Sequence, residues 1–306
     1  QDLKSVYIDL NDINSYANYV NSLGGNIRLE VGEQDSLTYI AAEKLFNRGN
    51  NEEARRSLIN YLQTFPEGAF SSNANYYLGS IAFSKKEYDE ALQRFKSVIE
   101  SGDTKFLEES VARTAEMQYL TQDFPAALES FKRLQIIAEN PENKQAARLG
   151  IMRCALQTGQ QEEAQLAANE LLKDPKLSPE VEAEARYIRA KAYIDHKQPA
   201  KAVEDLTILS KDTRTVHGAE AKYLLAQYFY DTNDDKNAEK ILEDFAKNGT
   251  PHQYWLARGF ILWADIYIRQ GDDLQARAYL NNLKNNYKGD DEIAAMIEDR
   301  LGKLKQ

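Results

Sequence analysis

Residues 65–99 read FPEGAFSSNANYYLGSIAFSKKEYDEALQRFKSVI and contain the pattern that decides the fold. Apolar and small residues recur every three or four positions in two successive segments, as they do on the buried face of a helix. The first segment carries Ala74, Leu78, Gly79, Ala82 and Phe83, and the second carries Ala91, Leu92, Phe95 and Val98. Gly79 and Ala91 are small enough to let two helix backbones approach closely. The stretch therefore predicts two helices that pack against each other across a short turn.

The same pattern recurs along the chain at intervals of 36 to 38 residues. A small residue marks the expected helix contact in each copy, and we call these residues the anchors: Ala54, Ala91, Ala127, Ala164, Ala202, Ala238 and Ala276. Twelve residues before the anchors stand Ala42, Gly79, Ala115, Met152, Ala190, Ala226 and Ala264. Agreement over seven copies indicates a repeat protein, in which each unit buries its apolar face against its neighbours.

A repeated helical hairpin with small residues on both sides of the helix contact resembles the tetratricopeptide repeat. The resemblance implies an all-α fold, a right-handed α–α superhelix of stacked hairpins. The period is slightly longer than the roughly 34 residues usual for that family, which leaves the pitch of the superhelix open. Met152 stands where the family has a small residue and implies a locally looser helix pair.

The sequence predicts three regions. Residues 1–34 form a partial leading repeat and a connector, residues 35–288 form seven hairpins, and residues 289–306 form a C-terminal capping helix. In the leading region Leu3, Tyr7 and Leu10 share one helical face, and Tyr16 takes the anchor place of a second helix that ends at Gly24–Gly25. The outer face of this region has no upstream neighbour, so we expect the chain to be a fragment of a longer array.

Local signals give the expected helix boundaries. The predicted pairs are 35–48 with 51–65, 71–84 with 88–101, 104–121 with 124–138, 141–157 with 161–173, 178–195 with 199–211, 215–231 with 235–247, and 251–270 with 273–287. A capping side chain precedes a proline at the first helical position in Asn140–Pro141, Ser178–Pro179 and Thr250–Pro251. Gly49, Gly159 and Gly271 lie five residues before their anchors, where the turn favours a left-handed residue.

Composition restricts the class of partner. The 306 residues carry a net charge of −10, which argues against nucleic acid because phosphate binding needs clustered Lys and Arg. No run of 18 apolar residues occurs, so we expect no direct membrane insertion. The first twenty residues lack a basic start and an apolar segment, so we expect no signal peptide there. The chain does not begin with Met, as expected for a processed protein or a piece of a larger one.

We find no pattern typical of an enzyme, and we expect no cofactor and no bound metal. His196, His217 and His252 lie in different repeats without a carboxylate or Cys at ligand spacing, and we interpret them as surface or capping residues. Acidic pairs such as Glu108–Glu109 cluster at helix starts, where they complement the helix dipole. Cys154 is interpreted as a small buried hydrophobe.

In the resembled family, three positions of each first helix line a concave surface, at fifteen, eleven and eight residues before the anchor. Here these positions carry many aromatic residues flanked by polar ones, a composition that suits an extended peptide or a partner helix. The candidate partner-binding residues are Tyr39, Glu43, Phe46, Tyr76, Ser80, Phe83, Tyr119, Arg153, Tyr187, Lys191, Tyr223, Gln227 and Tyr230. The alternative is that these tyrosines pack between helices and that the chain is a structural spacer whose groove binds no ligand.

The stretch FPEGAFSSNANYYLGSIAFSKKEYDEALQRF is most similar to bacterial envelope tetratricopeptide proteins, of the Tol–Pal-associated coordinator and outer-membrane-assembly lipoprotein groups. This resemblance implies a noncatalytic adaptor with a protein or peptide partner, in the periplasm or at the envelope, with a cytoplasmic location also open. Contacts through the uncapped N-terminal end are a further expectation. Tyr39, Glu43, Tyr76 and Ser80 replace the Lys, Asn and Arg with which related domains grip chaperone C-termini, which disfavours that ligand.

Overall fold

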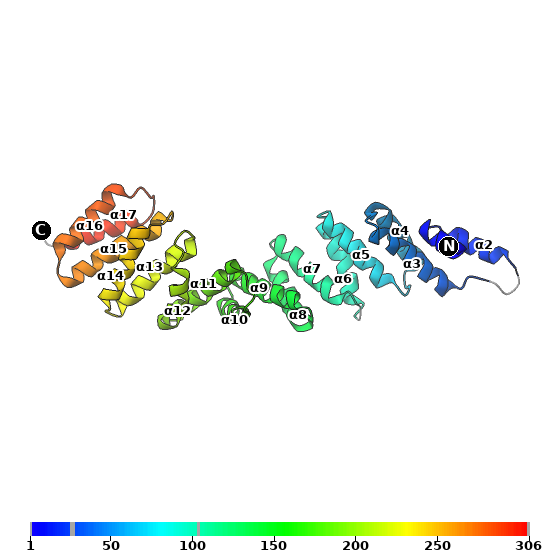
Figure 1. The fold of residues 1–306 in the computed structure, drawn as a ribbon, viewed down its shortest axis with the longest axis horizontal. Coiled ribbons are helices and arrows are strands. Elements are labelled where there is room, and N and C mark those ends of the chain that lie inside the picture. The colour runs from blue at the N-terminus through cyan, green and yellow to red at the C-terminus, as the bar shows by residue number, and fades with distance from the viewer. Residues whose placement is uncertain (1, 25–27, 103–104, 305–306) are drawn as a thin grey trace. The chain divides into compact units, whose positions relative to one another are not determined.

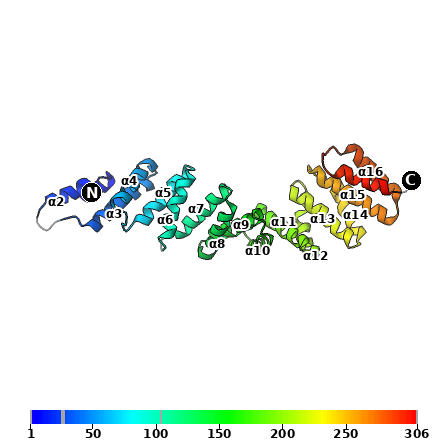
Figure 2. The ribbon, with the colours of Figure 1, turned by 180° about the vertical axis from the view of Figure 1, so that it is seen from behind.

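The computed structural model describes residues 2–24, 28–102 and 105–304. Within these ranges the regular structure is entirely α-helical, with seventeen helices and no strand (Figure 1; Figure 2 shows the ribbon from behind). The helices are α1 (Leu3–Asp9), α2 (Ile13–Ser22), α3 (Val31–Asn47), α4 (Asn51–Thr64), α5 (Ser71–Ser84), α6 (Tyr88–Glu100), α7 (Leu107–Leu120), α8 (Phe124–Ile137), α9 (Pro141–Gln157), α10 (Gln161–Leu171), α11 (Pro179–Asp195), α12 (Pro199–Leu209), α13 (Val216–Asp231), α14 (Asp235–Asn248), α15 (Gln253–Gln270), α16 (Asp273–Asn286) and α17 (Ile293–Lys303).

The chain divides into two compact units, residues 1–158 and residues 159–306. In the first unit α3 pairs with α4, α5 with α6 and α7 with α8, and each second helix also packs on the next first helix. The second unit repeats this order with α11–α12, α13–α14 and α15–α16, and α17 covers α15 and α16. The predicted all-α class built from helical hairpins is confirmed. The division of residues 35–288 into seven hairpins stays a prediction, because its fourth pair, α9 and α10, falls in different units.

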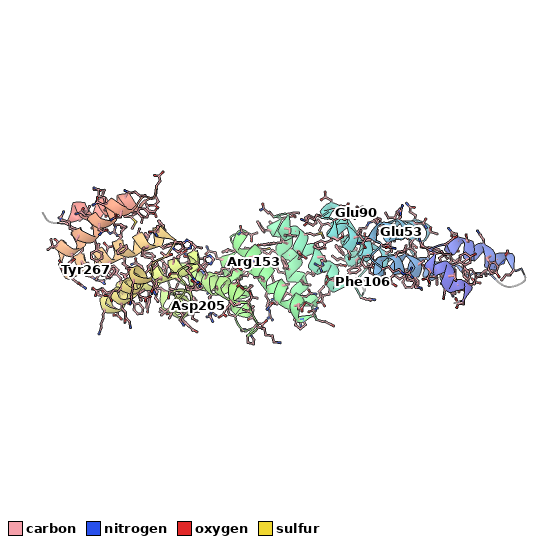
Figure 3. All side chains as sticks on the ribbon, turned by 45° about the horizontal axis from the view of Figure 1, so that its top comes forward. Glu53, Glu90, Phe106, Arg153, Asp205 and Tyr267 are labelled. Carbon is pink, nitrogen blue, oxygen red and sulfur yellow. The ribbon has the colours of Figure 1, made fainter. Side chains whose placement is uncertain are left out.

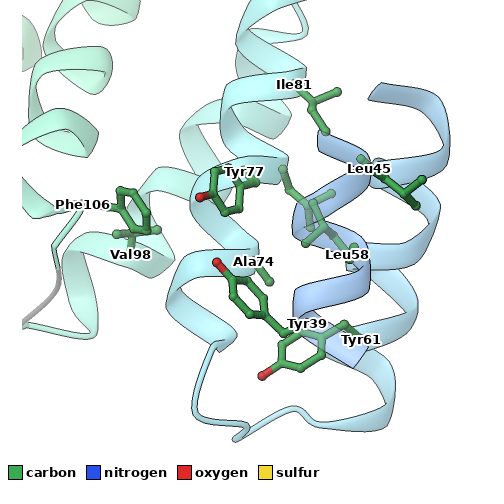
Figure 4. Close-up of a cluster of buried hydrophobic side chains, with 12 residues drawn as sticks. Tyr39, Leu45, Leu58, Tyr61, Ala74, Tyr77, Ile81, Val98 and Phe106 are labelled. Atoms are coloured by element: carbon green, nitrogen blue, oxygen red, sulfur yellow. The ribbon is translucent and has the colours of Figure 1, made fainter. Parts of the chain in front are cut away.

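The small residues that gave the period lie at the helix contacts. All seven anchors have 0% of their surface exposed, and the seven residues twelve positions earlier are buried as well. A Cβ added to Gly79 would lie 2.9 Å from the Phe95 ring, so a larger residue would push α5 away from α6. Around these contacts the larger apolar side chains fill the space, as Leu58, Tyr61 and Ile81 do in Figure 4.

The turn inside each hairpin has a left-handed residue five positions before the anchor. Gly49, Gly159 and Gly271 have φ angles of 80°, 75° and 79°, which confirms the prediction for these glycines. At the other four turns the residues are Lys86, Gln122, Lys197 and Asn233, with φ between 58° and 63°. A non-glycine residue enters this region only at a conformational cost, so the hairpin contacts impose the conformation there.

Several predicted boundaries are wrong. α7 begins at Leu107, three residues later than expected, and α10 and α12 end at Leu171 and Leu209, two residues earlier than expected. α3 begins at Val31, four residues earlier than expected, so the connector expected to run up to residue 34 ends before Val31. Residues 25–27 of this region lie outside the described part of the chain.

α15 begins at Gln253, two residues later than expected, and its N-cap is His252. The Thr250 hydroxyl donates to the carbonyl of Thr213 and accepts the N–H of His252. The caps at Asn140 and Ser178 are confirmed.

The leading helices α1 and α2 both pack on α3, and the buried residues of α2 are Ile13 and Ala17. Tyr16, expected in the anchor place, is only half-buried and contacts the ring of Tyr7 at a centroid distance of 5.8 Å. The backbone nevertheless has the expected register: Asn11, five residues before Tyr16, has a φ of 54°, and α2 begins three residues before Tyr16, as α4 begins three residues before Ala54. The small buried side chain of α2 is Ala17, one residue later.

Gly150 in α9 tests how closely the helices must approach. A Cβ at this position would lie 2.4 Å from ring atoms of Phe131 in α8, and a buried ring cannot move aside as a flexible chain can. We expect Gly150→Ala to lower the free energy of unfolding by about 1–3 kcal/mol, the usual cost of overpacking, measured by urea denaturation. Gly32→Ala in α3, where nothing lies within 4 Å, is the matched control and should leave stability equal or slightly higher. Equal stability of wild type and Gly150→Ala would contradict the close approach.

Candidate functional site

Aromatic rings join successive first helices within each unit. The tyrosine fifteen residues before an anchor lies against a ring at the start of the next first helix. In the first unit Tyr39 stacks on Phe70 (4.4 Å between centroids, 2° between planes) and Tyr76 on Phe106 (3.9 Å, 7°). In the second unit Tyr187 stacks on His217 (3.9 Å, 15°), and Tyr223 contacts Trp255 (5.7 Å, 31°). We call these four contacts the ring junctions.

Hydrogen bonds hold the hydroxyls of three ring-junction tyrosines, Tyr39, Tyr187 and Tyr223, inside the protein. Tyr39 donates to Glu43 (2.7 Å) and accepts from the side-chain amide of Asn73 (3.2 Å). Glu43 also accepts from Tyr77 (2.8 Å), and Figure 4 shows Tyr39 and Tyr77 on neighbouring helices. Burial, with the hydrogen bond to Glu43, raises the pKa of the Tyr39 hydroxyl, and the same causes raise that of Tyr77 to about 12. These phenols therefore act as neutral donors.

The second unit has equivalent hydrogen bonds. Tyr223 donates to Gln227 (2.9 Å) and accepts from the guanidinium of Arg258 (2.8 Å). Tyr187 donates to Glu220 (2.8 Å), and Lys191 forms an ion pair with the same carboxylate (3.0 Å). Lys191 and Gln227, which were expected to face a ligand, therefore bind to side chains of this chain.

Four further candidate residues, Phe46, Ser80, Phe83 and Tyr230, are half-buried. Phe46 lies against Tyr77 at 4.5 Å, and the guanidinium of Arg113 lies 5.1 Å from the Phe83 ring centroid. Tyr230 lies under Arg269 at 3.8 Å, and the Ser80 hydroxyl donates to the carbonyl of Tyr76. Tyr39 and Tyr223 are buried and offer no free face to a ligand. A binding role for the half-exposed candidates stays a prediction.

The sequence reasoning missed the second partner of each ring junction. Phe70, Phe106, His217 and Trp255 each lie twenty-one residues before an anchor, so a search at that offset would have found them. His217 was interpreted as a surface or capping residue; its ring instead stacks on Tyr187. His196 and His252 do stand at helix caps, at the end of α11 and the start of α15.

Asp35 in α3 and Glu108 in α7 each lie near the start of a first helix. Each carboxylate binds backbone N–H groups that precede the next first helix. Asp35 accepts from Tyr61 (2.6 Å) and from the N–H of Ala69 (2.9 Å). Glu108 accepts from the N–H groups of Glu139 and Asn140 and from the side chain of Asn143. Burial alone raises the pKa of Glu108, but the backbone N–H of Glu139 and the other two donors lower it below its ordinary value of 4.5. Glu108 thus acts across the repeat boundary as well as at its own helix start.

A cleft of about 670 Å³ lies between α7 and α9 in the first unit. Ala112 and Leu149, the residues fifteen before their anchors, line it, and they are not aromatic. Two of the candidate residues, Tyr119 and Arg153, also line it (Arg153 is labelled in Figure 3). Phe131, Leu134 and Gly150 are buried lining residues, and the polar ones include Glu109, Arg113, Glu116, Glu142 and Asn143. The cleft combines an apolar floor with a charged rim.

A larger cavity of about 790 Å³ lies between α15 and α16 and contains none of the candidate residues. Its walls are mainly apolar, with Leu256, Phe260 and Tyr279, and its only charged lining residue is Lys288. The ammonium of Lys288 donates to the carbonyl of Asn285, so it is already engaged in a local contact.

The described residues contain no cluster of three His, Cys, Asp or Glu side chains that could hold a metal ion. Among the helices described, none is both long and apolar enough to cross a membrane. Cys154 is buried, as expected, and burial raises the pKa of its thiol to about 11, which disfavours a reactive thiolate.

Two sequence models of the tetratricopeptide repeat match the chain, at residues 41–104 and 260–290. The chain contains tetratricopeptide repeats. The matched segments include the anchors Ala54, Ala91 and Ala276. No curated protein matches the chain in sequence.

Several solved structures are similar to this chain at low sequence identity. A tetratricopeptide repeat protein from Parabacteroides merdae is 15% identical, with a TM-score of 0.45 over 87% of this chain and 98% of that one. Naa15/Naa10 bound to HypK-THB gives a TM-score of 0.55 at 12% identity, over 88% of this chain and 39% of that one. YrrB, described as having an unusual peptide-binding site, is 20% identical with a TM-score of 0.44, over 56% of this chain and 82% of that one.

The buried ring junctions predict a stability effect. Tyr39→Ala removes a ring that is 3% exposed and stacked on Phe70, so we expect the free energy of unfolding to fall by about 3 kcal/mol in urea denaturation. Tyr19→Ala, a half-exposed tyrosine of α2, is the control and should change stability by less than about 0.5 kcal/mol. Equal effects of the two substitutions would contradict the packing role of Tyr39.

The carboxylate of Glu108 predicts a pH dependence. Because its pKa is lowered in the folded state, its stabilisation is complete above the ordinary value of 4.5 and is lost as the pH falls through the folded-state pKa. Glu108→Gln should therefore lower Tm at pH 7, and its Tm difference from wild type should shrink towards pH 3. Glu162→Gln, an exposed first-turn glutamate of α10, controls for a general effect of removing charge. A Tm difference that stays constant from pH 7 to pH 3 would exclude the role of the charged form.

Proposed function

We propose that this chain is a noncatalytic protein-interaction scaffold that binds an extended peptide or a helix in the cleft between α7 and α9. The observation that carries the proposal is the cleft itself, because it opens on the face where the candidate residues were expected and includes Tyr119 and Arg153. Its volume of about 670 Å³ lies within the roughly 300–1,000 Å³ typical of ligand pockets.

The contrast with the neighbouring hairpins supports this location. At the ring junctions, stacked rings and internal hydrogen bonds occupy the face that a ligand would need. Between α7 and α9 the apolar floor and the charged rim remain accessible, an arrangement suited to an anchor side chain with polar groups that set its register.

A noncatalytic role fits the titratable groups. Tyr39 and Tyr187, whose pKa values are raised by burial and by a hydrogen bond to a carboxylate, donate to these carboxylates within packed contacts. A structural spacer is the second candidate function. It is favoured by the ring junctions, since four tyrosines at expected groove positions take part in joining helices.

The N-terminal end offers a second contact surface. Leu3 in α1 is 45% exposed, and Leu10 and Leu23, which directly follow α1 and α2, are 68% and 53% exposed, which supports the expected contacts through this end. We further propose a location in the periplasm or at the bacterial envelope, which rests on the sequence resemblance of residues 65–95 alone. Cell fractionation tests this location, and recovery only in the cytoplasmic fraction would overturn it.

The binding role can be tested with a random twelve-residue peptide library displayed on phage and selected on the full chain. Enriched peptides are synthesised with a fluorophore, and their Kd is measured by fluorescence polarisation. We expect Tyr119→Ala/Leu149→Ala to raise Kd at least about tenfold, because both side chains line the cleft. Tyr193→Ala/Leu166→Ala removes the same side-chain types from the second unit and should leave Kd within about twofold.

Circular dichroism checks that both double variants stay folded. Failure to enrich any peptide, or equal loss of binding in both variants, would overturn the proposal and favour the spacer.

A further inference from the structure

The cleft between α7 and α9 opens at the place where a ring junction is missing. At the four ring junctions a tyrosine fifteen residues before one anchor meets a ring twenty-one residues before the next. The corresponding residues of α7 and α9 are Ala112 and Asn143. Both line the cleft, so the space of the two missing rings contributes to it.

The cleft lining includes a hydrogen-bond acceptor, the Glu116 carboxylate, at the position where other first helices accept from a tyrosine hydroxyl. At two ring junctions the phenol donates to the side chain four residues later in its own helix, Tyr39 to Glu43 and Tyr223 to Gln227. Four residues after Ala112 stands Glu116, another cleft residue. The carboxylate of Glu116 is therefore an acceptor at the helical position where the chain's own tyrosine hydroxyls donate.

The charges that line the cleft favour a ligand with a positive charge. Arg113 bridges Glu109 (2.9 Å) and Glu116 (3.0 Å), so one guanidinium serves two carboxylates. Glu142 adds an exposed carboxylate, and Arg153 is the second cation of the lining. Three carboxylates and two guanidiniums leave an excess of negative charge, which attracts a positively charged segment.

We propose that this cleft binds an extended peptide through a tyrosine side chain that has a lysine or arginine next to it. The tyrosine ring takes the space that the chain's own rings fill at the ring junctions, and its hydroxyl donates to Glu116. The basic residue lies near the carboxylates of Glu109 and Glu142. The inference rests on the proposed function, since it names the partner of the same cleft.

The experiment starts from the peptides enriched on the full chain by the random library. We expect them to share a tyrosine next to Lys or Arg. In the synthetic peptides, changing this tyrosine to Ala should raise Kd at least about tenfold, and changing it to Phe should raise Kd by a smaller factor, because the ring remains. Changing the adjacent basic residue to Glu should weaken binding, and raising the salt concentration should weaken the parent peptide more than this variant.

A protein variant closes the cleft from within. Ala112→Tyr/Asn143→Phe supplies the two missing rings but removes the hydrogen bond from Asn143 to Glu108, so we expect a folded variant whose peptide Kd rises at least about tenfold. Glu116→Gln keeps the shape of the acceptor and should reduce the difference in Kd between the Tyr and Phe peptides. The peptide substitutions need no protein variant, so they decide the proposal even if the filled variant does not fold.

The outcomes separate the two proposals. Enriched peptides without an aromatic residue that still lose binding in Tyr119→Ala/Leu149→Ala would overturn the tyrosine proposal and leave the proposed function standing. Unchanged binding to a folded Ala112→Tyr/Asn143→Phe variant would also overturn it. Failure to enrich any peptide would overturn both.

Discussion

A two-helix hairpin repeated every 36 to 38 residues cannot bury its apolar faces alone, and this constraint governs the rest of the structure. Each helix must therefore approach its partner and its neighbour closely. The seven anchors have 0% exposure, and Gly79 and Gly150 place helix backbones against the rings of Phe95 and Phe131. Stability thus resides in contacts between hairpins as much as within them.

The ring junctions are one of the means by which neighbouring hairpins are joined. A tyrosine of one first helix meets a ring thirty to thirty-two residues later, and carboxylates such as Asp35 and Glu108 hold the backbone ahead of the next first helix. The same face can serve packing or binding. It packs where both rings are present, and a cleft lies where Ala112 and Asn143 replace them. The proposed site is in this sense a junction completed by a partner's side chain.

The sequence predicted what local patterns determine. Anchor positions, the glycine turns and the caps at Asn140 and Ser178 follow from helical periodicity and backbone preference, which involve residues close in the chain. The left-handed turns at Lys86, Gln122 and Lys197 were not predicted, because the hairpin imposes this conformation on residues that do not favour it.

Periodicity could not decide between packing and binding for the tyrosines. It indicates which face of a helix a residue occupies. Tyr39, however, is stacked on Phe70 of the next hairpin, and the register between hairpins determines that contact. The cleft escaped prediction for the same reason, since Ala112 and Asn143 become informative only when compared with the ring pairs at equivalent positions.

A double-mutant cycle on Tyr76 and Phe106 tests most directly whether the ring junctions join the hairpins. The rings are 3.9 Å apart and nearly parallel, and urea denaturation of the two single variants and the double variant to Ala gives their coupling energy. If the junction joins α5 to α7, the coupling should be favourable by about 0.5–1.5 kcal/mol, as measured for other aromatic pairs. A coupling energy of zero within error would contradict it.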